Sequence, residues 1–195
     1  MDKISFIAPC FNEESVIEEY YIRLCEIADT YNEYEFEFVV VNDASEDGSA
    51  VLLDNLATRD IRLVIIHLAA NVGQQTALFA GIEAAKGDIN ITIDIDLQDP
   101  PELIKLFIQK IEEGFEVIHA QRLSRAEETA FKKLSAKLFY RFLSITSSVR
   151  LIDDCGDFRA FTKPVRQAVS MYREKHKYLR GIFAIVGFNQ TIVQY

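Results

Sequence analysis

Residues 89–99 read INITIDIDLQD. The stretch starts as an apolar, strand-like run and ends in three aspartates within six positions, Asp94, Asp96 and Asp99. Like charges so close together repel and raise one another's pKa, which costs stability unless something positive lies beside them. The stretch therefore predicts a buried strand with a binding site for a positive group at its carboxyl end.

The rest of the chain repeats this strand pattern in alternation with helical patterns. Strands are predicted at 4–9, 36–43, 62–69, 89–94 and 115–122, and helices at 13–28, 48–58, 74–86 and 101–113. The strand segments are nearly continuous apolar runs rich in β-branched residues, as in parallel strands buried on both faces. Their alternation with helices predicts an α/β fold, a single domain with a mostly parallel sheet flanked by helices.

The pattern changes after residue 122. A longer helix is predicted at about 127–147, followed by a loop, LIDDCGDFRAF (151–161), and a mixed segment that ends in the strand-like QTIVQY (190–195). We expect this second half to adapt the site built by the first. The abrupt end of the sequence after that strand suggests a piece cut from a longer protein.

Composition narrows the class of protein. A chain of 195 residues with 49% hydrophobic and 26% charged residues is typical of one ordinary globular domain. The formal net charge of −9 argues against nucleic-acid binding, since such domains usually carry a basic excess. Three cysteines without metal-ligand spacing, no signal peptide and no apolar run of about 20 residues predict a soluble cytoplasmic domain.

Polar residues follow each predicted strand. They are PCFNEE (9–14), NDAS (42–45), NVG (71–73), the aspartates of 94–99, and Arg122. In open α/β sheets, ligands bind beyond the carboxyl ends of the strands. We therefore expect these five groups to converge on one crevice.

Asp94, Asp96 and Gln98 are candidate metal ligands. In extended geometry these alternate residues share one face. Two carboxylates and an amide oxygen suit a hard divalent cation such as Mg²⁺ or Mn²⁺. The competing interpretation is a solvated acidic turn that caps the helix starting near Pro101, and Asp99 fits that interpretation well. For Asp94 and Asp96, metal binding is favoured.

The stretch NDASEDG (42–48) has two interpretations of equal weight. Asn, Asp, Ser and Gly form turns and helix caps. Alternatively, Asp43 accepts hydrogen bonds from a nucleotide, as acidic residues at the end of a second strand often do. The chain contains neither G-x-G-x-x-G after its first strand nor G-x-x-x-x-G-K-[ST], so phosphates would depend on a metal and basic side chains.

Basic residues gather between positions 122 and 141. They are Arg122, Arg125, Lys132, Lys133, Lys137 and Arg141, and the last three fall on one stripe of the predicted helix. A solvated basic face explains them by itself. The alternative is a local basic patch, in an acidic protein, that faces phosphate or an anionic membrane surface.

Several motifs together resemble a known family. IAPCFNEE, VVVNDASEDGS, NVGQQTALFAGIEAAKGD, IDIDLQDPPE, AQR and CGDFRAF resemble, in order and spacing, the family 2 glycosyltransferases of GT-A fold, whose sheet is Rossmann-like. The chain looks most like the branch that glycosylates polyprenyl phosphates such as dolichol and undecaprenyl phosphate. DxDLQDPPE and GDFR are specific to this branch, whereas NDxSxDGS marks only the wider family. The resemblance covers essentially the whole chain.

The resemblance implies a role for individual residues. The nucleotide would be held by Pro9, Phe11, Asn12, Glu13, Asp43 and Asp94. The metal, Mg²⁺ or Mn²⁺, would be held by Asp94, Asp96 and Gln98. Acceptor phosphate would be contacted by Arg122, Arg125, Lys133 and Lys137. Asp157 would be the candidate catalytic base, with Arg159 helping to place the lipid phosphate.

The resemblance also implies the reaction and its setting. We expect an inverting transfer of a sugar from a UDP- or GDP-sugar to a polyprenyl phosphate, feeding cell-envelope glycan or lipid modification, at the cytoplasmic face of the membrane. Residues 1–99 would form the nucleotide and metal half, and 100–195 the acceptor side. Family members commonly continue into membrane helices, and a homo-oligomer is compatible with the sequence.

Three other functions compete with this expectation. A family 2 enzyme with a soluble sugar or glycan acceptor would share the donor half. A nucleotidyltransferase also places acidic metal ligands on an α/β sheet, but usually shows a Gly-rich basic loop where this chain has PCFNEE. A non-catalytic nucleotide-binding domain would have no reason to keep Asp43, Asp94, Asp96 and Asp157 together. We favour an enzyme.

Overall fold

The computed structural model describes residues 2–123, 155–174 and 177–195. The strands are β1 (Lys3–Cys10), β2 (Glu35–Asn42), β3 (Leu63–His67), β4 (Ile89–Thr92), β5 (Val117–Gln121), β6 (Cys155–Thr162) and β7 (Gln190–Gln194). The helices are α1 (Ile17–Thr30), α2 (Ser49–Ala57), α3 (Gln74–Ala84), the 3₁₀ turn η1 (Pro101–Leu103), α4 (Ile104–Glu112), α6 (Lys163–Ser170) and α7 (Leu179–Ile185). No helix within these ranges is both long and apolar enough to cross a membrane.

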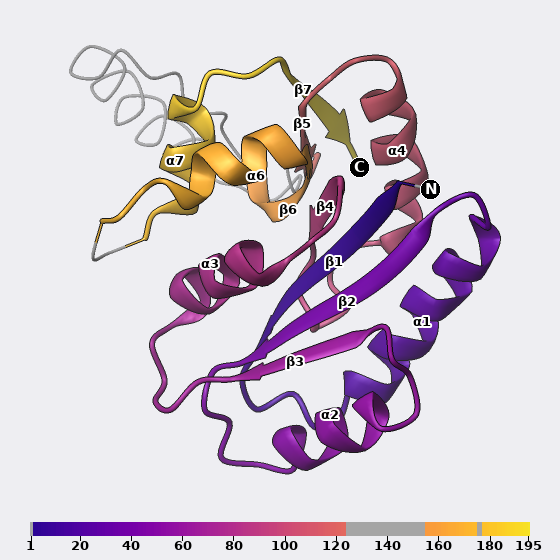
Figure 1. Cartoon of the computed structure of the whole chain (residues 1–195), viewed down its shortest axis with the longest axis vertical. Coiled ribbons are helices and arrows are strands. Elements are labelled where there is room, and N and C mark those ends of the chain that lie inside the picture. The colour runs from indigo at the N-terminus through magenta and orange to yellow at the C-terminus, as the bar shows by residue number, and fades with distance from the viewer. Residues whose placement is uncertain (1, 124–154, 175–176) are drawn as a thin grey trace.

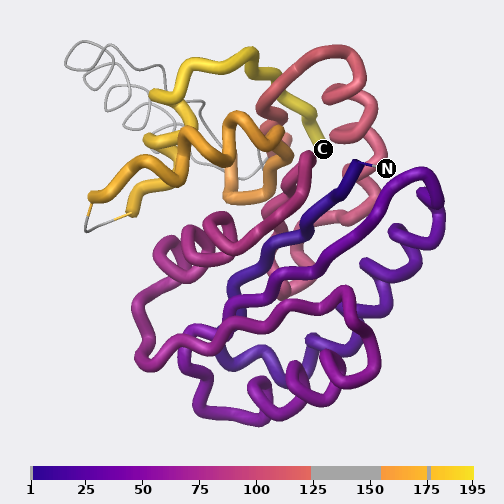
Figure 2. The backbone as a smooth tube through the Cα atoms, viewed as in Figure 1, coloured from indigo at the N-terminus to yellow at the C-terminus, as the bar shows by residue number. Residues whose placement is uncertain are grey.

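The strands form one seven-stranded sheet in the order β3-β2-β1-β4-β6-β5-β7. Strand β6 runs antiparallel to both of its neighbours, and the other pairs are parallel. Figure 2 follows the chain through this sheet. The predicted mostly parallel sheet is confirmed. Because β1, β2 and β4 are parallel neighbours, the loops that follow them meet at one edge.

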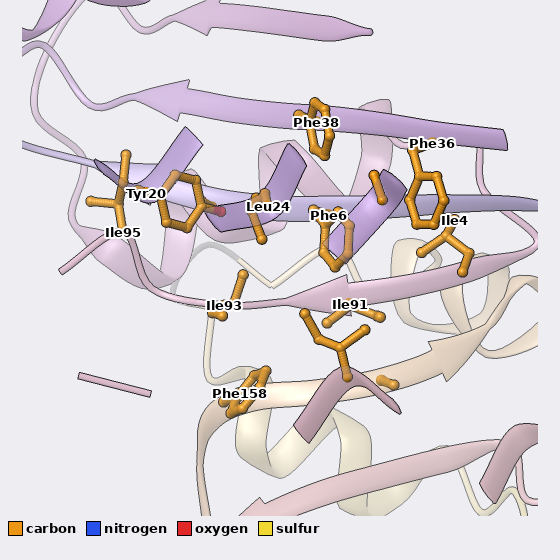
Figure 3. Close-up of a cluster of buried hydrophobic side chains, with 14 of the residues drawn as sticks. Ile4, Phe6, Tyr20, Leu24, Phe36, Phe38, Ile91, Ile93, Ile95 and Phe158 are labelled. Carbon is orange, nitrogen blue, oxygen red and sulfur yellow. The ribbon is translucent and has the colours of Figure 1, made fainter. Parts of the chain in front are cut away.

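Helices cover both faces of the sheet (Figure 1). Helices α1, α2 and α4 pack on one face and α3, α6 and α7 on the other, each layer with its own apolar cluster. Figure 3 shows the first cluster, in which the Phe6 ring stacks between Phe36 and Phe38 at centroid distances of 5.9 and 5.8 Å. Burial of such clusters on both faces explains why the strands are continuous apolar runs.

The segment 155–161, predicted to be a loop, is strand β6, so that prediction was wrong. It pairs with β4 on one side and β5 on the other, and Phe158, Ala160 and Phe161 are buried. The polar residues Asp157 and Arg159 interrupt its apolar pattern, yet both are buried as well. Pairing with strands more than 30 residues away, and not the local pattern, makes this segment a strand.

Helix α1 starts at Ile17 and not at the predicted residue 13. The backbone N–H of Glu13 donates to Ser49 Oγ at 2.9 Å, and that of Glu14 donates to Asp47 Oδ2 at 3.1 Å. These bonds tie the loop after β1 to the loop after β2. They hold the chain away from helical geometry before the apolar face of α1 begins.

The basic helix predicted at 127–147 falls outside the described residues, and so do Arg125, Lys133 and Lys137.

Helix α3 lies unusually close to the sheet at Gly81. A Cβ atom built there would come within 2.6 Å of Ile7 Cγ2 and 3.1 Å of Val41 Cγ2. Both neighbours are β-branched side chains in buried strands and have little freedom to move. Only glycine therefore permits this approach, which fixes the height of α3 above β1 and β2.

We expect Gly81→Ala to destabilise the protein by about 1–3 kcal/mol, because overpacking outweighs the gain in helix propensity. Urea unfolding measures the effect. Glu83→Ala, at an exposed position of the same helix, serves as the control and should stay within about 0.5 kcal/mol of the wild type. A stabilised Gly81→Ala variant would contradict the close packing described here.

Candidate functional site

A cleft of about 440 Å³ lies at the carboxyl edge of the sheet. It is lined by Pro9, Cys10, Phe11, Glu13, Asp43, Asn71, Gly73, Gln74, Asp94, Ile95 and Asp96. These residues come from the end of β1, from the segments that follow β1, β2, β3 and β4, and from the first residue of α3. The structure thus brings together six residues that the sequence singled out: Pro9, Phe11, Glu13, Asp43, Asp94 and Asp96.

The other predicted residues lie elsewhere. Asn12 lines a second depression, with Glu14 and Asp47. Gln98, Arg122, Asp157 and Arg159 do not line the cleft.

The loops around the cleft hold residues in left-handed backbone conformation. Asn12, Ala44 and Leu97 have φ values of 57°, 56° and 59°, and they follow β1, β2 and β4 respectively. Such a conformation costs a non-glycine residue about 1–2 kcal/mol and persists only where the surroundings enforce it. Here Asn12 N–H donates to Ser45 Oγ at 3.0 Å, and Asn12 Oδ1 accepts from Glu46 N–H at 2.8 Å.

Asp43 is a buried carboxylate at the end of β2. Its two oxygens accept hydrogen bonds from the backbone N–H groups of Val72 and Gly73, at 2.8 and 2.9 Å. The side chain therefore anchors the loop between β3 and α3 while lining the cleft. This is a structural role, and contact of Asp43 with a nucleotide stays a prediction.

Negative charge accumulates in the cleft. Burial, followed by the nearby carboxylates of Asp157, Asp96 and Asp99, raises the pKa of Asp94 to about 6, and a hydrogen bond from Gln74 opposes this rise. The pKa of Glu13 is also raised, by burial first and then by Asp96. No cation among the described residues is paired with the carboxylate of Asp94 or Glu13, so the cleft suits a positive ligand.

The extended geometry from which the metal ligands were predicted is not found, and metal binding by Asp94, Asp96 and Gln98 stays a prediction. Strand β4 ends at Thr92, and the turn that follows contains Leu97 with positive φ, so residues 94–98 are not extended. Gln98 is exposed, and its backbone N–H donates to Asp96 Oδ1 at 3.0 Å. Asp94 and Asp96 line the cleft, whereas the Gln98 side chain does not.

The two remaining carboxylates fit a divalent cation that takes its other ligands from outside the protein. Within the described ranges, no group of three or more His, Cys, Asp or Glu side chains is arranged to hold a metal ion. Mg²⁺ is commonly bound by one or two carboxylates together with water and substrate phosphates. The donor set here matches that kind of site, because the described residues place no cation beside the carboxylate of Asp94.

Asp157 lies on β6, beside the cleft. Its Oδ2 accepts a hydrogen bond from Gln75 Nε2 at 2.6 Å, and its Oδ1 accepts from Arg159 Nη2 at 3.2 Å. Arg180 Nε lies 3.7 Å from the same Oδ1. Thr92 Oγ1 donates to the Asp157 carbonyl, which fixes the strand next to β4. The Asp157 carboxylate thus accepts hydrogen bonds from two side chains and forms an ion pair with a third.

Arg159 acts on Asp157 and is not accessible to a lipid in this structure. Its side chain is 2% exposed, and its guanidinium lies 4.5 Å from the centre of the Phe183 ring. Burial lowers its pKa to about 10, which leaves it charged at neutral pH. Its Nη2 also donates to the Gly156 carbonyl at 2.8 Å.

Arg122 holds the end of the aspartate loop. Its Nη2 donates to Asp99 Oδ1 at 2.7 Å, and its Nε donates to the phenol oxygen Oη of Tyr195 at 2.8 Å. Asp99 is therefore paired with Arg122, and the η1 turn that begins at Pro101 has no side-chain cap. The interpretation of Asp99 as a helix cap was wrong. Contact of Arg122 with phosphate stays a prediction.

Sequence reasoning missed three residues around the site: Gln74, Gln75 and Arg180. The two glutamines open α3 directly after the loop that Asp43 anchors, and they contact Asp94 and Asp157 respectively. Their position just past a strand-end loop was a usable signal, because helix N-termini in such folds face the ligand. Arg180 gave no local signal, since it reaches Asp157 from α7.

We expect Asp94→Asn to stabilise the ligand-free protein at pH 8 by about 1–2 kcal/mol, because it removes a destabilised charge. A carboxyl whose pKa is raised to about 6 in the folded protein weakens folding as the pH rises above its ordinary pKa, and the effect is complete above pH 6. The gain should therefore fade as the pH falls from 6 towards 4. Urea unfolding at pH 8 and pH 4.5 measures it.

The control is Asp29→Asn, at an exposed position of α1, which should change the stability little at either pH. An Asp94→Asn protein less stable than the wild type at pH 8 would disprove the uncompensated charge.

With this geometry described, comparison with known proteins identifies the family. The model of the family "Glycosyl transferase family 2" matches residues 5–169. The uncharacterized glycosyltransferase YkcC of Bacillus subtilis (strain 168) is 43% identical over 191 residues, which cover 98% of this chain and 59% of that protein. The prophage bactoprenol glucosyl transferase homolog of Escherichia coli (strain K12) is 35% identical over 193 residues, which cover 99% of this chain and 63% of that protein. The chain thus spans about three fifths of the length of these relatives.

Solved structures agree in fold. The TarS fragment 1–349 of S. aureus superposes with a TM-score of 0.65 at 17% identity, covering 98% of this chain and 58% of that one. The mannosyltransferase PcManGT of Pyrobaculum calidifontis, in complex with GDP-Man and Mn²⁺, superposes with a TM-score of 0.63 at 17% identity. The match covers 99% of this chain and 55% of that one. These likenesses confirm the GT-A architecture expected from the sequence. The chain belongs to glycosyl transferase family 2.

Proposed function

We propose that this chain is the catalytic domain of an inverting glycosyltransferase that moves a sugar from a nucleotide-sugar to a polyprenyl phosphate. The observation that carries the proposal is the acidic cleft at the ends of β1, β2 and β4, where no cation of the described part of the chain pairs with Asp94 or Asp96 and where Asp157 lies close to Asp94. The relatives named bactoprenol glucosyl transferase support the lipid acceptor.

The nucleotide of the donor would occupy the cleft. Pro9, Phe11 and Glu13 line it from the end of β1 and the loop that follows, and Asn12 shapes that loop. Asp43 lines it at the end of the neighbouring strand β2. The diphosphate would then point towards Asp94 and Asp96, the negative end of the cleft. Solved structures of this fold hold GDP-Man or UDP-GlcNAc, so both UDP and GDP donors are candidates.

Asp94 and Asp96 would hold Mg²⁺ or Mn²⁺ between the protein and the diphosphate. The bound ion would neutralise the charge that develops on the leaving diphosphate, a contribution of several kcal/mol. Gln98 is not part of this proposed set, because its side chain is exposed outside the cleft.

The acceptor would approach from the side of β6 and α7. One oxygen of the lipid phosphate attacks the anomeric carbon while the nucleoside diphosphate leaves, and this single displacement inverts the anomeric configuration. Since the phosphate is already ionised at neutral pH, Asp157 has no proton to remove and serves to orient its neighbours. Arg180, whose side chain is 51% exposed, offers the accessible positive charge beside Asp157.

The remaining parts of the proposal concern the setting. Arg125, Lys133 and Lys137 would add phosphate contacts, and Arg122 would contribute if its bond to Asp99 opens. An acceptor that is a membrane lipid places the reaction at a membrane surface, for which we propose the cytoplasmic face. A homo-oligomer is compatible with this arrangement.

We expect UDP or GDP to bind the protein in the presence of Mn²⁺ and to bind at least about tenfold more weakly without it or in Asp96→Ala, because the carboxylate and the diphosphate share the cation. Calorimetric titration of both nucleotides, with and without Mn²⁺, measures this. Asp29→Asn is the control and should bind as the wild type does. Equal binding with and without the metal, and in Asp96→Ala, would refute the proposed metal site.

We expect the protein to transfer sugar to a short-chain polyprenyl phosphate, with inversion at the anomeric carbon. The assay uses radiolabelled UDP-glucose and GDP-mannose, and NMR of the product reports the anomeric configuration. Asp157→Asn should lower kcat on the order of 100-fold, because the groups around the acceptor lose their orientation. If free sugars or glycans accept the label and the lipid phosphate does not, the acceptor is a soluble one.

A further inference from the structure

The first turn of α3 contacts two acidic groups, Asp94 and Asp157, through two neighbouring amides. Gln74 Nε2 donates to the two carboxylate oxygens of Asp94 at 3.0 and 3.1 Å. Gln75 Nε2 donates to Asp157 Oδ2 at 2.6 Å, and its Oε1 accepts from the backbone N–H of Leu179 at 3.2 Å. One helical turn therefore joins the aspartate after β4, the aspartate on β6 and the start of α7.

The orientation of the Gln75 amide is determined by its partners. A backbone N–H can only donate, so the amide oxygen must face Leu179 and the amide nitrogen must face Asp157. On its other side the carboxylate accepts from Arg159 at 3.2 Å. The Asp157 side chain, 6% exposed, is thus held between an amide and a guanidinium.

Helix α3 is itself fixed to the donor cleft. Asp43 binds the N–H of Gly73, the residue just before α3, and Gly81 lets the helix pack directly against Ile7 and Val41. The Gln75 side chain therefore projects from a support that belongs to the nucleotide half. Its contacts with Asp157 and Leu179 are contacts with the acceptor side.

We propose that Gln75 is a positioning residue that holds Asp157 and the start of α7 in register with the donor cleft. This inference rests on the proposed function, because it takes Asp157 to be part of the acceptor side. The attacking phosphate oxygen must meet the anomeric carbon at reaction distance, and a displacement of about 1 Å can cost on the order of 100-fold in rate. Gln75 limits that displacement through two hydrogen bonds.

A purely structural role for Gln75 makes different predictions. A structural residue would lower the stability of the fold and disturb the nucleotide site together with the acceptor site, because α3 borders the cleft. A positioning residue lowers kcat while the binding of the donor nucleotide stays as it is. The split between kcat and nucleotide affinity separates the two.

The test compares Gln75→Met with Gln109→Met in the full chain. The first removes both hydrogen bonds at nearly constant side-chain length, and the second is a matched change at an exposed position of α4. We expect Gln75→Met to lower kcat with a short-chain polyprenyl phosphate by about 10- to 100-fold and to leave the Kd for the nucleotide with Mn²⁺ within about twofold. Gln109→Met should match the wild type in both.

A second variant keeps the test decisive if Gln75→Met fails to fold. Gln75→Glu retains the size and the oxygen that accepts from Leu179, but places a carboxylate oxygen against Asp157 in place of the donor. We expect the same loss of kcat with unchanged nucleotide affinity. Unfolding curves of all variants confirm that the folded protein is compared.

Asp157→Asn, alone and combined with Gln75→Met, separates failure of the inference from failure of the proposed function. If Gln75 acts through Asp157, the double variant loses little more kcat than Asp157→Asn alone. Full activity of Asp157→Asn, or no transfer to lipid phosphate by the wild type, would overturn the proposed function. If Asp157→Asn is impaired but Gln75→Met keeps the kcat of the wild type, the positioning role is wrong. It is also wrong if Gln75→Met loses nucleotide affinity by the same factor as kcat, or if its full loss of kcat adds to that of Asp157→Asn in the double variant.

Discussion

The antiparallel pairing of β6 with β4 is the constraint on which the candidate site depends. It places Asp157 beside Asp94 although 63 residues separate them in the chain, and the Thr92 hydroxyl fixes the contact by donating to the Asp157 carbonyl. After burial, Asp157 is the strongest cause of the raised pKa of Asp94. Without this one antiparallel strand, Asp157 would reach neither Asp94 nor Gln75.

The residues of the site lower the stability of the ligand-free protein and favour the binding of a ligand. Carboxylates gather where burial raises the pKa of Asp94, and three loops hold non-glycine residues with positive φ. Amides offset part of this cost. Backbone N–H groups of the loop before α3 satisfy Asp43, and the side chains of Gln74 and Gln75 donate to Asp94 and Asp157. A bound cation and its nucleotide would supply the rest, which is why a ligand should stabilise this chain strongly.

Sequence patterns were most informative where a segment's environment is uniform. The apolar runs that form β1 and β2 are buried on both faces, so an unbroken apolar pattern indicated a buried strand. The acidic residues after β4 indicated the position of the cleft. Patterns failed where long-range contacts decide the conformation. Strand β6 mixes Asp157 and Arg159 into its apolar run because these residues pair with each other in the interior. Gln98 was misplaced because the strand before it ends early, at Thr92.

By itself the amino-acid sequence determined the α/β class, the order of the first five strands and four helices, the family resemblance and the aspartates at one edge, because these follow from local hydrophobic periodicity and from short motifs. Only the tertiary structure decided which acids meet and what holds them. It paired Arg122 with Asp99, buried Arg159 beneath Phe183, and brought Gln75 and Arg180 to Asp157. Those contacts join residues from different elements, and their geometry arises from packing, which no local stretch of sequence encodes.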